Sequence, residues 1–186
     1  MLTINFHPFK NLETERLLLR RVAASDVNEI IELRGNPDAM KYIPRPLVTT
    51  AEEALAHFEM IDSKIESNEG INWAITVKGS PKLIGIIGHY RIEPEHHRSE
   101  IGYMILPQYN GQGITSEAVK AILVYGFDDM NLHSVEAVLD SRNVGSEKVL
   151  QKNGFVKEAH LVESECYDGI FIDRLTYSLL KRNFKR

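Results

Sequence analysis

Several features that commonly identify a protein class are scarce in this 186-residue sequence. It contains a single cysteine, Cys166, so no disulfide can form within the chain. No apolar run approaches the roughly 20 residues that a membrane-spanning helix needs. The first residues also lack the basic stretch and apolar segment of a signal peptide. We therefore expect a cytoplasmic protein that does not bind a membrane.

Positively charged residues are fewer than negatively charged ones. The chain has 22 Lys and Arg against 26 Asp and Glu, which gives a formal net charge of −4. Proteins that bind nucleic acid usually carry a basic face, so we expect no nucleic-acid partner. His96 and His97 are adjacent, and no third ligand stands at the spacing of a zinc site. We expect no metal.

Sequence features that separate domains are absent as well. No internal repeat, low-complexity tract or Gly/Ser linker divides the chain. Hydrophobic residues at 43% and charged residues at 26% are ordinary values for a globular protein. The length suits one domain with a sizeable core. We expect a single domain over residues 1–186, with its core at about 12–180.

Hydrophobic periodicity predicts the element order β-α-α-β-β-β-α-β-α-β-β. The expected strands are 17–21, 72–77, 83–92, 100–106, 134–139 and two that begin near Val156 and Ile170; the expected helices begin near Ser25 or Asp26, after the capping-box pair Thr50 and Glu53, after Gly113, and at Gly145. This order predicts an α/β (α+β) fold. We expect a mixed, mostly antiparallel central sheet of about seven strands with helices on both faces.

The most informative stretch joins a strand-like run, residues 101–106, to a helix. The helix is indicated by apolar residues at helical spacing, which are Ile114, Ala118, Ala121, Ile122 and Tyr125. Between them lie Gly111 and Gly113, and glycine tolerates both a positive φ and a close approach of the backbone to a ligand. The first amides of a helix have no intrahelical partner and lie at the positive end of its dipole. We therefore expect a phosphate or pyrophosphate to bind at this turn.

Two common phosphate-binding loops do not fit this turn. A Walker A loop needs Gly-Lys-Ser/Thr, but Ile114 follows Gly113, and a dinucleotide loop needs a third glycine where Ser116 stands. The spacing Gln108-x-x-Gly111-x-Gly113 instead resembles the acyl-CoA pyrophosphate loop of the GNAT acetyltransferases. The alternative is an incidental glycine pair in a strand-to-helix turn.

Other segments resemble the same family in the expected order. Residues 140–155 resemble the N-x-x-S to G-F segment that follows the fifth strand of that family. Residues 167–180 resemble the last hairpin strand of the branch that acetylates ribosomal-protein alanine N-termini, and residues 12–20 and 100–103 also match that branch. The resemblance covers about residues 12–180. It implies a GNAT-like fold and the use of acetyl-CoA without a metal.

The resemblance also implies where acetyl-CoA binds. The pantetheine arm would lie beside residues 104–106 as a pseudo-strand, and Asn143 would contact it or cap the helix that follows. The residues expected to bind the cofactor are Met104, Ile105, Leu106, Gly111, Gln112, Gly113, Ile114, Thr115, Ser116 and Asn143. Because its charge would repel a phosphate, Glu117 in the first turn of the helix should point away from the loop.

Acetyl transfer to an amine needs a base for the ammonium proton and a means of stabilising the departing thiolate. Glu100 is the candidate base, although it could be an ordinary strand-end carboxylate, and His89 is the alternative. In several branches of the family a tyrosine protonates the thiolate, but Leu150 stands at that position here. Ser146 is the candidate donor, and it could equally be a residue of the first helical turn.

The resemblance implies an enzyme that moves an acetyl group from acetyl-CoA to a primary amine. One candidate acceptor is the N-terminal amine of a ribosomal or other protein, and another is a small amine such as a polyamine or an amino acid. A non-catalytic acyl-CoA sensor on the same fold is the alternative function. Loops near residues 36–49 and 163–168 should select the acceptor. The oligomeric state stays open, with a homodimer among the options.

Overall fold

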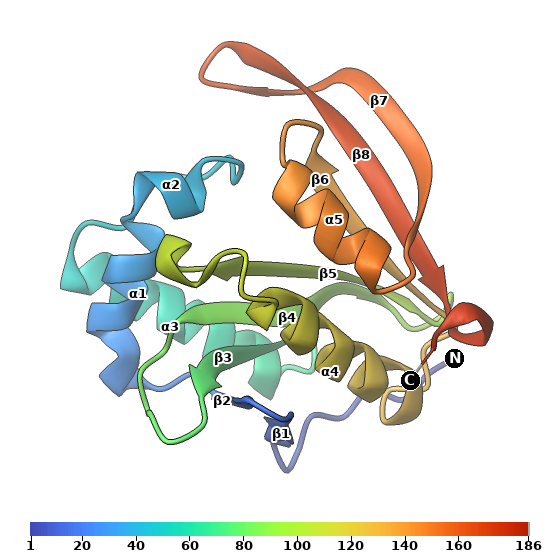
Figure 1. Cartoon of the computed structure of the whole chain (residues 1–186). Coiled ribbons are helices and arrows are strands. Elements are labelled where there is room, and N and C mark those ends of the chain that lie inside the picture. The colour runs from blue at the N-terminus through green and yellow to red at the C-terminus, as the bar shows by residue number, and fades with distance from the viewer. Residues whose placement is uncertain (186) are drawn as a thin grey trace.

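An eight-stranded sheet forms the centre of the protein, and its strand order is β1-β2-β3-β4-β5-β6-β8-β7 (Figure 1). The computed structural model describes residues 1–185. The strands are β1 Leu12–Glu13, β2 Leu17–Arg21, β3 Ile71–Val77, β4 Gly85–Glu93, β5 Arg98–Ile105, β6 Ser134–Asp140, β7 Val156–Tyr167 and β8 Ile170–Leu180. Neighbouring strands are antiparallel except β5 and β6, which are parallel. The expected mixed, mostly antiparallel sheet is confirmed. The extra strand is β1, whose two residues are too few to give a sequence pattern.

Five α-helices surround the sheet in the part of the chain that the structure describes. They are α1 Val27–Arg34, α2 Pro37–Met40, α3 Ala51–Glu66, α4 Ile114–Asp128 and α5 Val144–Lys152. The predicted capping box opens α3, because Thr50 and Glu53 each accept a hydrogen bond from the other's backbone amide. The short helix α2 is not among the helices expected from the sequence. Asn36 accepts hydrogen bonds from two following amides and caps this helix, in which Pro37 is the first residue.

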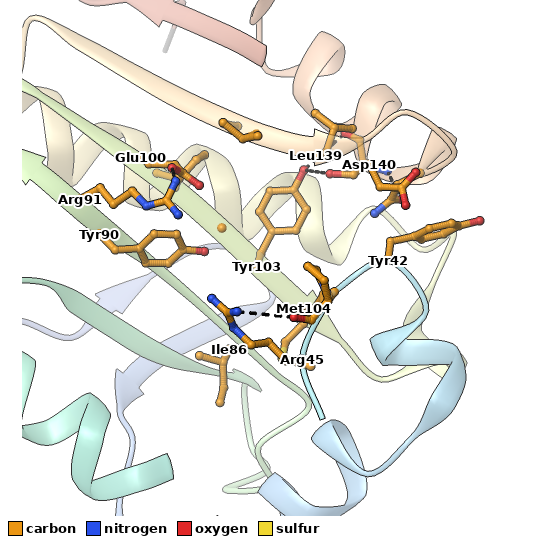
Figure 2. Close-up of a pocket in the computed structure, with 18 of the residues that line it drawn as sticks. Tyr42, Arg45, Ile86, Tyr90, Arg91, Glu100, Tyr103, Met104, Leu139 and Asp140 are labelled. Atoms are coloured by element: carbon orange, nitrogen blue, oxygen red, sulfur yellow. Dashed lines mark hydrogen bonds and ion pairs between the residues drawn. The ribbon is translucent and has the colours of Figure 1, made fainter. Parts of the chain in front are cut away.

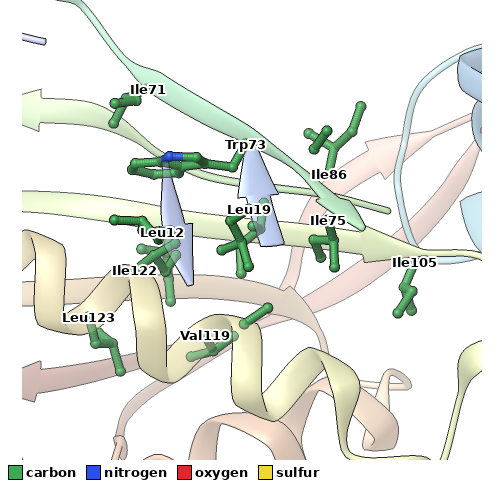
Figure 3. Packing of buried hydrophobic residues seen from close by; sticks show 14 of the residues in the cluster. Leu12, Leu19, Ile71, Trp73, Ile75, Ile86, Ile105, Val119, Ile122 and Leu123 are labelled. Carbon is green, nitrogen blue, oxygen red and sulfur yellow. The ribbon is translucent and has the colours of Figure 1, made fainter. Parts of the chain in front are cut away.

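The two faces of the sheet are covered by different helices (Figure 1). On one face α4 packs against β3 and β4, with the Trp73 and Tyr125 rings in edge contact at a centroid distance of 5.1 Å. Figure 3 shows Leu19 and Ile75 on the same side of the sheet, directed toward Val119 of this helix. The other face is covered by α3, which contacts β3, and by α1, which packs on α3. Within residues 1–185, no helix is both long and apolar enough to span a membrane.

The parallel pair β5 and β6 stays together only at one end. Its register comprises three residue pairs, from Arg98 with Ser134 to Glu100 with Glu136. Beyond these pairs β5 continues to Ile105 and β6 to Asp140 without further pairing between the two strands. The strands diverge there in Figure 1. The divergence leaves one backbone edge of β5 open.

Candidate functional site

A cleft of about 710 Å³ occupies the region where β5 and β6 separate. Figure 2 shows Tyr103 and Met104 of β5 on one side, with Leu139 and Asp140 of β6 on the other. The cleft extends across β4 toward α3, the end of α1 and the loop that joins α2 to α3. An extended ligand could therefore lie between the strands while a second molecule approaches from the side of α1 and α3.

The glycine turn before α4 presents bare backbone amides. Gly111 and Gly113 have φ angles of +75° and +76°, in the left-handed region that favours glycine. Gly113 is the N-cap of α4, and no side chain caps this helix. Within the described residues, none of the amides from Gly111 to Ser116 donates to a protein acceptor. These amides can bind an anion at the positive end of the helix dipole.

Glu117 is directed away from this turn, toward the segment between β1 and β2. Its carboxylate accepts hydrogen bonds from Thr14 Oγ1 at 2.5 Å and from Arg16 Nε at 2.7 Å. Burial alone would raise the pKa of Glu117, but the hydrogen bonds from Thr14 and Arg16 lower it overall. Arg16 also donates to the Gln112 carbonyl at 3.0 Å. Arg16 therefore anchors the loop, a role that the sequence analysis did not assign.

The other side chains of the loop are mostly engaged with the protein. Gln112 donates to the Gln108 carbonyl at 2.8 Å, and Ser116 Oγ accepts from Asn153 Nδ2 at 3.0 Å. Ile114 is buried in the core, whereas Thr115 is half-buried. The side chains of Gln112, Ile114 and Ser116 thus shape the turn, while their backbone amides have no acceptor in the described protein.

The open edge of β5 carries amides at alternate residues. The Leu106 amide donates to the Ile84 carbonyl of the neighbouring chain segment at 2.9 Å. Because hydrogen bonds alternate along an antiparallel strand, the amides of Tyr103 and Ile105 point to the opposite side, into the gap beside β6. The amide of Leu106 is therefore engaged within the protein, whereas the amide of Ile105 is free to bind a cofactor. Met104 contributes its side chain to the wall of the cleft.

Asn143 can serve both roles that the sequence analysis treated as competing. Its Oδ1 accepts a hydrogen bond from the Ser146 amide at 3.0 Å, which caps α5. Its Nδ2 has no hydrogen-bond acceptor among the described residues, and the residue lines the cleft. One amide group can therefore cap the helix with its oxygen and donate to a ligand with its nitrogen.

Two hydroxyl groups meet at the wall of the cleft. Ser146 Oγ lies 2.7 Å from the Tyr103 hydroxyl, so α5 and β5 are joined across the gap. Burial raises the pKa of Tyr103 to about 12, although the hydrogen bond with Ser146 opposes this rise, so the phenol stays protonated at neutral pH. Leu150 is fully buried. Tyr103 belongs to the run 100–103 that resembles the family, but the sequence alone predicts no role for its hydroxyl.

Glu100 lies in the same cleft, on the face of β5 that looks toward α3. Only 12% of its side chain is exposed, and Arg91 Nη1 donates to its carboxylate at 2.7 Å. Burial raises the pKa of Glu100, and Arg91 only partly offsets this effect. Tyr90 stands opposite Glu100 on β4 (Figure 2). The Tyr90 hydroxyl lies 1.4 Å from the place of a Cβ on Gly102, so this glycine makes room for the ring.

His89, the alternative base, is absent from the cleft. It is completely buried on the α4 face, where its two ring nitrogens lie 2.8 Å from Ser99 Oγ and 2.8 Å from the Ile122 carbonyl. Burial lowers the pKa of His89 to about 4. This histidine is part of the core and cannot reach an acceptor in the cleft. No cluster of three or more His, Cys, Asp or Glu side chains suited to a metal ion occurs in residues 1–185.

Two solved structures of enzymes with named acceptors are similar to this fold. A ribosomal-protein-alanine acetyltransferase from Vibrio fischeri has a TM-score of 0.83 and 25% identity, with 95% of this chain and 100% of that chain covered. A spermidine N-acetyltransferase from Vibrio cholerae, in complex with CoA and spermine, has a TM-score of 0.80 and 24% identity. The match covers 91% of this chain and 98% of that chain. At 24% identity, the similarity to the spermidine N-acetyltransferase is evidence only for a shared fold.

Sequence comparison gives the family. Residues 16–156 match the family model described as the acetyltransferase (GNAT) domain. The uncharacterised N-acetyltransferase YoaA of Bacillus subtilis is 31% identical over 173 residues, which are 93% of this chain and 98% of that protein. The crystal structure of a GNAT-family acetyltransferase from Bacillus anthracis has a TM-score of 0.82 at 29% identity, covering 93% of this chain and 99% of the other. The chain is an N-acetyltransferase that belongs to the GNAT family.

Proposed function

We propose that this N-acetyltransferase takes its acetyl group from acetyl-CoA and transfers it to a primary amine, either a protein N-terminus or a small molecule. The observation that carries the proposal is the continuous run of free amides from Gly111 to Ser116 beside the open edge of β5. The free amides of the turn suit a pyrophosphate, and the open strand edge suits an extended chain that contains amide groups. Acetyl-CoA has both parts.

The residues present fit the pyrophosphate and the pantetheine arm of this cosubstrate. The amides of the turn, at Gly111, Gln112 and Gly113 and in the first turn of α4, would bind the pyrophosphate. The amide of Ile105 and the Nδ2 of Asn143 would hydrogen-bond the pantetheine arm between the strands. When bound, acetyl-CoA supplies the acetyl group as an activated thioester.

Glu100 is the base that we propose for the acceptor amine. An ammonium group must lose a proton before its nitrogen can attack a carbonyl carbon. The carboxylate of Glu100 lines the cleft and would accept this proton directly or through one water. Since burial raises its pKa toward the working pH, Glu100 is a stronger base than an exposed glutamate.

Ser146 is the proton donor that we propose for the departing sulfur. Its hydroxyl lines the cleft at the start of α5, and the Tyr103 hydroxyl beside it would orient it or replace its proton. A CoA thiol is acidic enough that its thiolate can leave without a proton donor, at a lower rate. Ser146 would therefore accelerate the reaction without being indispensable.

A thiol-release assay with acetyl-CoA and a panel of amines tests the proposed function. The panel contains N-terminal peptides of ribosomal proteins, polyamines, and amino acids with their amides. We expect at least one amine to release free CoA well above the hydrolysis background. Binding of acetyl-CoA by calorimetry with no turnover on any amine would instead favour the non-catalytic sensor.

We also propose that the protein forms a homodimer through the hairpin of β7 and β8. This hairpin extends away from the rest of the molecule in Figure 1 and carries the exposed side chains of Val162, Ile170 and Phe171. Exposed apolar side chains that cluster at one place are a common feature of association surfaces. Sedimentation velocity of the wild type and of the Phe171→Ser variant tests this proposal. A monomeric wild type would contradict it.

A further inference from the structure

The wall of the cleft formed by α1, α3 and the loop between α2 and α3 carries unpaired positive charge. Arg34, Arg45 and Lys64 line the cleft there, and none of them lies within 4.0 Å of a carboxylate in the described part of the chain. Arg45 donates only to the neighbouring Pro44 carbonyl, at 3.5 Å. The Nε of Arg34 is buried and has no hydrogen-bond partner in the protein.

The backbone brings the two arginines together. Arg34 is the last residue of α1, and its carbonyl accepts a hydrogen bond from the Val48 amide at 3.2 Å, which returns the loop carrying Arg45 to this helix. Gly35 permits the approach, because a Cβ there would lie only 2.6 Å from the Val48 carbonyl oxygen. Burial lowers the pKa of Arg34, and the charge of Arg45 lowers it further. The two guanidinium groups therefore repel each other unless an anion lies between them.

The acidic groups of the cleft do not compensate this charge. Glu100 is paired with Arg91, Asp140 with Arg142, and Glu165 with Arg174. Asp173 is held by His160 and by the Glu163 amide. Among the carboxylates that line the cleft in the described chain, only Glu69 has no such partner. The free charge of the cleft is therefore positive and lies on the wall that faces the acceptor.

His57 is a further titratable group on this wall. This histidine of α3 lines the same wall. Burial lowers the pKa of His57 to about 4, and the positive charges of Arg34 and Lys64 contribute to the shift. The imidazole is thus neutral at pH 7 and adds no charge of its own to this wall.

We propose that Arg34 and Arg45 form a subsite for a carboxylate on the acceptor, so that the preferred acceptor is a primary amine that also carries a carboxylate. Guanidinium groups bind carboxylates by charge-assisted hydrogen bonds with a planar geometry that suits the carboxylate oxygens. A bound carboxylate would offset the positive charge that Arg34 and Arg45 bring to this wall of the cleft. A polyamine, which is cationic throughout, would be repelled. The inference rests on the proposed function and specifies its substrate class.

Matched acceptors test the subsite. The peptide amides Ala-Asp-Ala and Ala-Asn-Ala differ by one carboxylate, and alanine differs from alaninamide in the same way at the carboxyl end. We expect the carboxylate-bearing member of one pair to show a kcat/KM at least about tenfold higher, a difference of about 1.4 kcal/mol. The peptide pair and the amino-acid pair distinguish an acidic peptide from a free amino acid. Equal rates within each pair, or spermidine as the best acceptor, would overturn the inference.

Variants assign the effect to the arginines. Arg45→Gln and Arg34→Gln should each remove most of the preference for the carboxylate and leave the KM for acetyl-CoA within twofold of wild type. Arg34→Lys keeps the positive charge and should retain part of the preference for the carboxylate. This variant controls for loss of activity caused by misfolding. Arg182→Gln is the matched control, since Arg182 is exposed and outside the cleft. An effect on acetyl-CoA alone would place the arginines in the cofactor site and overturn the inference.

Binding of the peptides to the CoA complex of the protein, measured by calorimetry, separates the two proposals. Carboxylate-dependent binding that Arg45→Gln abolishes, without turnover on any amine, would refute catalysis and support the subsite. Turnover on amines with no dependence on the carboxylate would support catalysis and refute the subsite.

Discussion

The proposed cofactor-binding region and the acceptor side of the cleft are built from different kinds of groups. On the cofactor side, the groups that face a ligand are mainly backbone amides, from Gly111 to Ser116 and along the edge of β5. On the acceptor side they are side chains, above all Glu100, Arg34 and Arg45, which come from three separate parts of the chain. A backbone site depends on strand, turn and helix geometry, so it can stay constant while side chains change. A side-chain site can change its specificity by a few substitutions.

Loss of the proposed base, Glu100, should give the largest effect. Glu100→Gln should lower kcat/KM for the amine by roughly 100-fold, as expected for a general base, and leave the affinity for acetyl-CoA unchanged. Because the base works when deprotonated, activity rises with pH through the pKa of Glu100. Burial raises that pKa, so the rise in the pH–rate profile should occur at a higher pH than for an ordinary glutamate. This rise should be absent from the profile of the variant. Rates across pH with one acceptor measure both effects.

The amine's own deprotonation also produces a rising limb, so wild type and variant must be compared on the same acceptor. Glu15→Gln is the matched control, since Glu15 is exposed and outside the cleft. If the Glu100→Gln variant keeps the pH–rate profile of the wild type and a kcat/KM within twofold of it, Glu100 is not the base.

On the cofactor side, Ser146→Ala should lower kcat by roughly 10- to 100-fold with little change in the KM for acetyl-CoA, because the hydroxyl matters only as charge develops on sulfur. Steady-state kinetics with varied acetyl-CoA measures both constants. A change confined to KM would make Ser146 a binding contact. Unchanged kinetics with a lower melting temperature would mean that Ser146 only stabilises the start of α5.

A change in the glycine turn should affect only the cofactor side. Gly113→Val should raise the Kd for acetyl-CoA by at least about tenfold, or about 1.4 kcal/mol, because Gly113 has a φ of +76° and adjoins the free amides. Gly79→Val is the matched control, since Gly79 has a φ of +84° and open space around its Cβ position, and it lies in the turn before β4. Both variants should lose stability, but only the first should lose affinity in calorimetry. Equal affinities in the two folded variants would refute the loop assignment.

Removal of the Tyr103 hydroxyl should have the smallest effect. Tyr103→Phe breaks one hydrogen bond to Ser146, and a bond worth roughly 0.5–1.5 kcal/mol corresponds to about a two- to tenfold loss in kcat. If Tyr103 acts by positioning Ser146, the same change should cost nothing further in the Ser146→Ala background. A double-mutant cycle on kcat measures the coupling. Full additivity would mean that the two hydroxyls act independently.

The contrast between the two sides also explains what the sequence could predict. The positive φ of Gly111 and Gly113, the helix after them and the outward direction of Glu117 follow from local rules, and the structure has each of them. The capping box of α3 is local in the same way. These features need only neighbouring residues, so a short motif is sufficient to predict them.

The missed features depend on residues that are distant in sequence. Tyr103 and Ser146 are 43 positions apart, and only the divergence of β5 and β6 makes their hydroxyls neighbours. Arg34 and Arg45 meet because the loop returns to α1. His89 was the alternative base because it lies in the strand next to that of Glu100. Both faces of this strand are buried near His89, and alternation alone cannot tell which face borders the cleft. Such contacts require the tertiary structure.

The short register between β5 and β6 has a further consequence for the cohesion of the molecule. Strands β6, β8 and β7 join the rest of the sheet through only three residue pairs. A ligand that hydrogen-bonds to both sides of the gap would act as an additional strand and fasten the two parts together. At a ligand concentration 100 times its Kd, mass action alone adds about 2.7 kcal/mol to the free energy of unfolding. The supply of acetyl donor would thus raise the folded fraction of the enzyme as well as its rate.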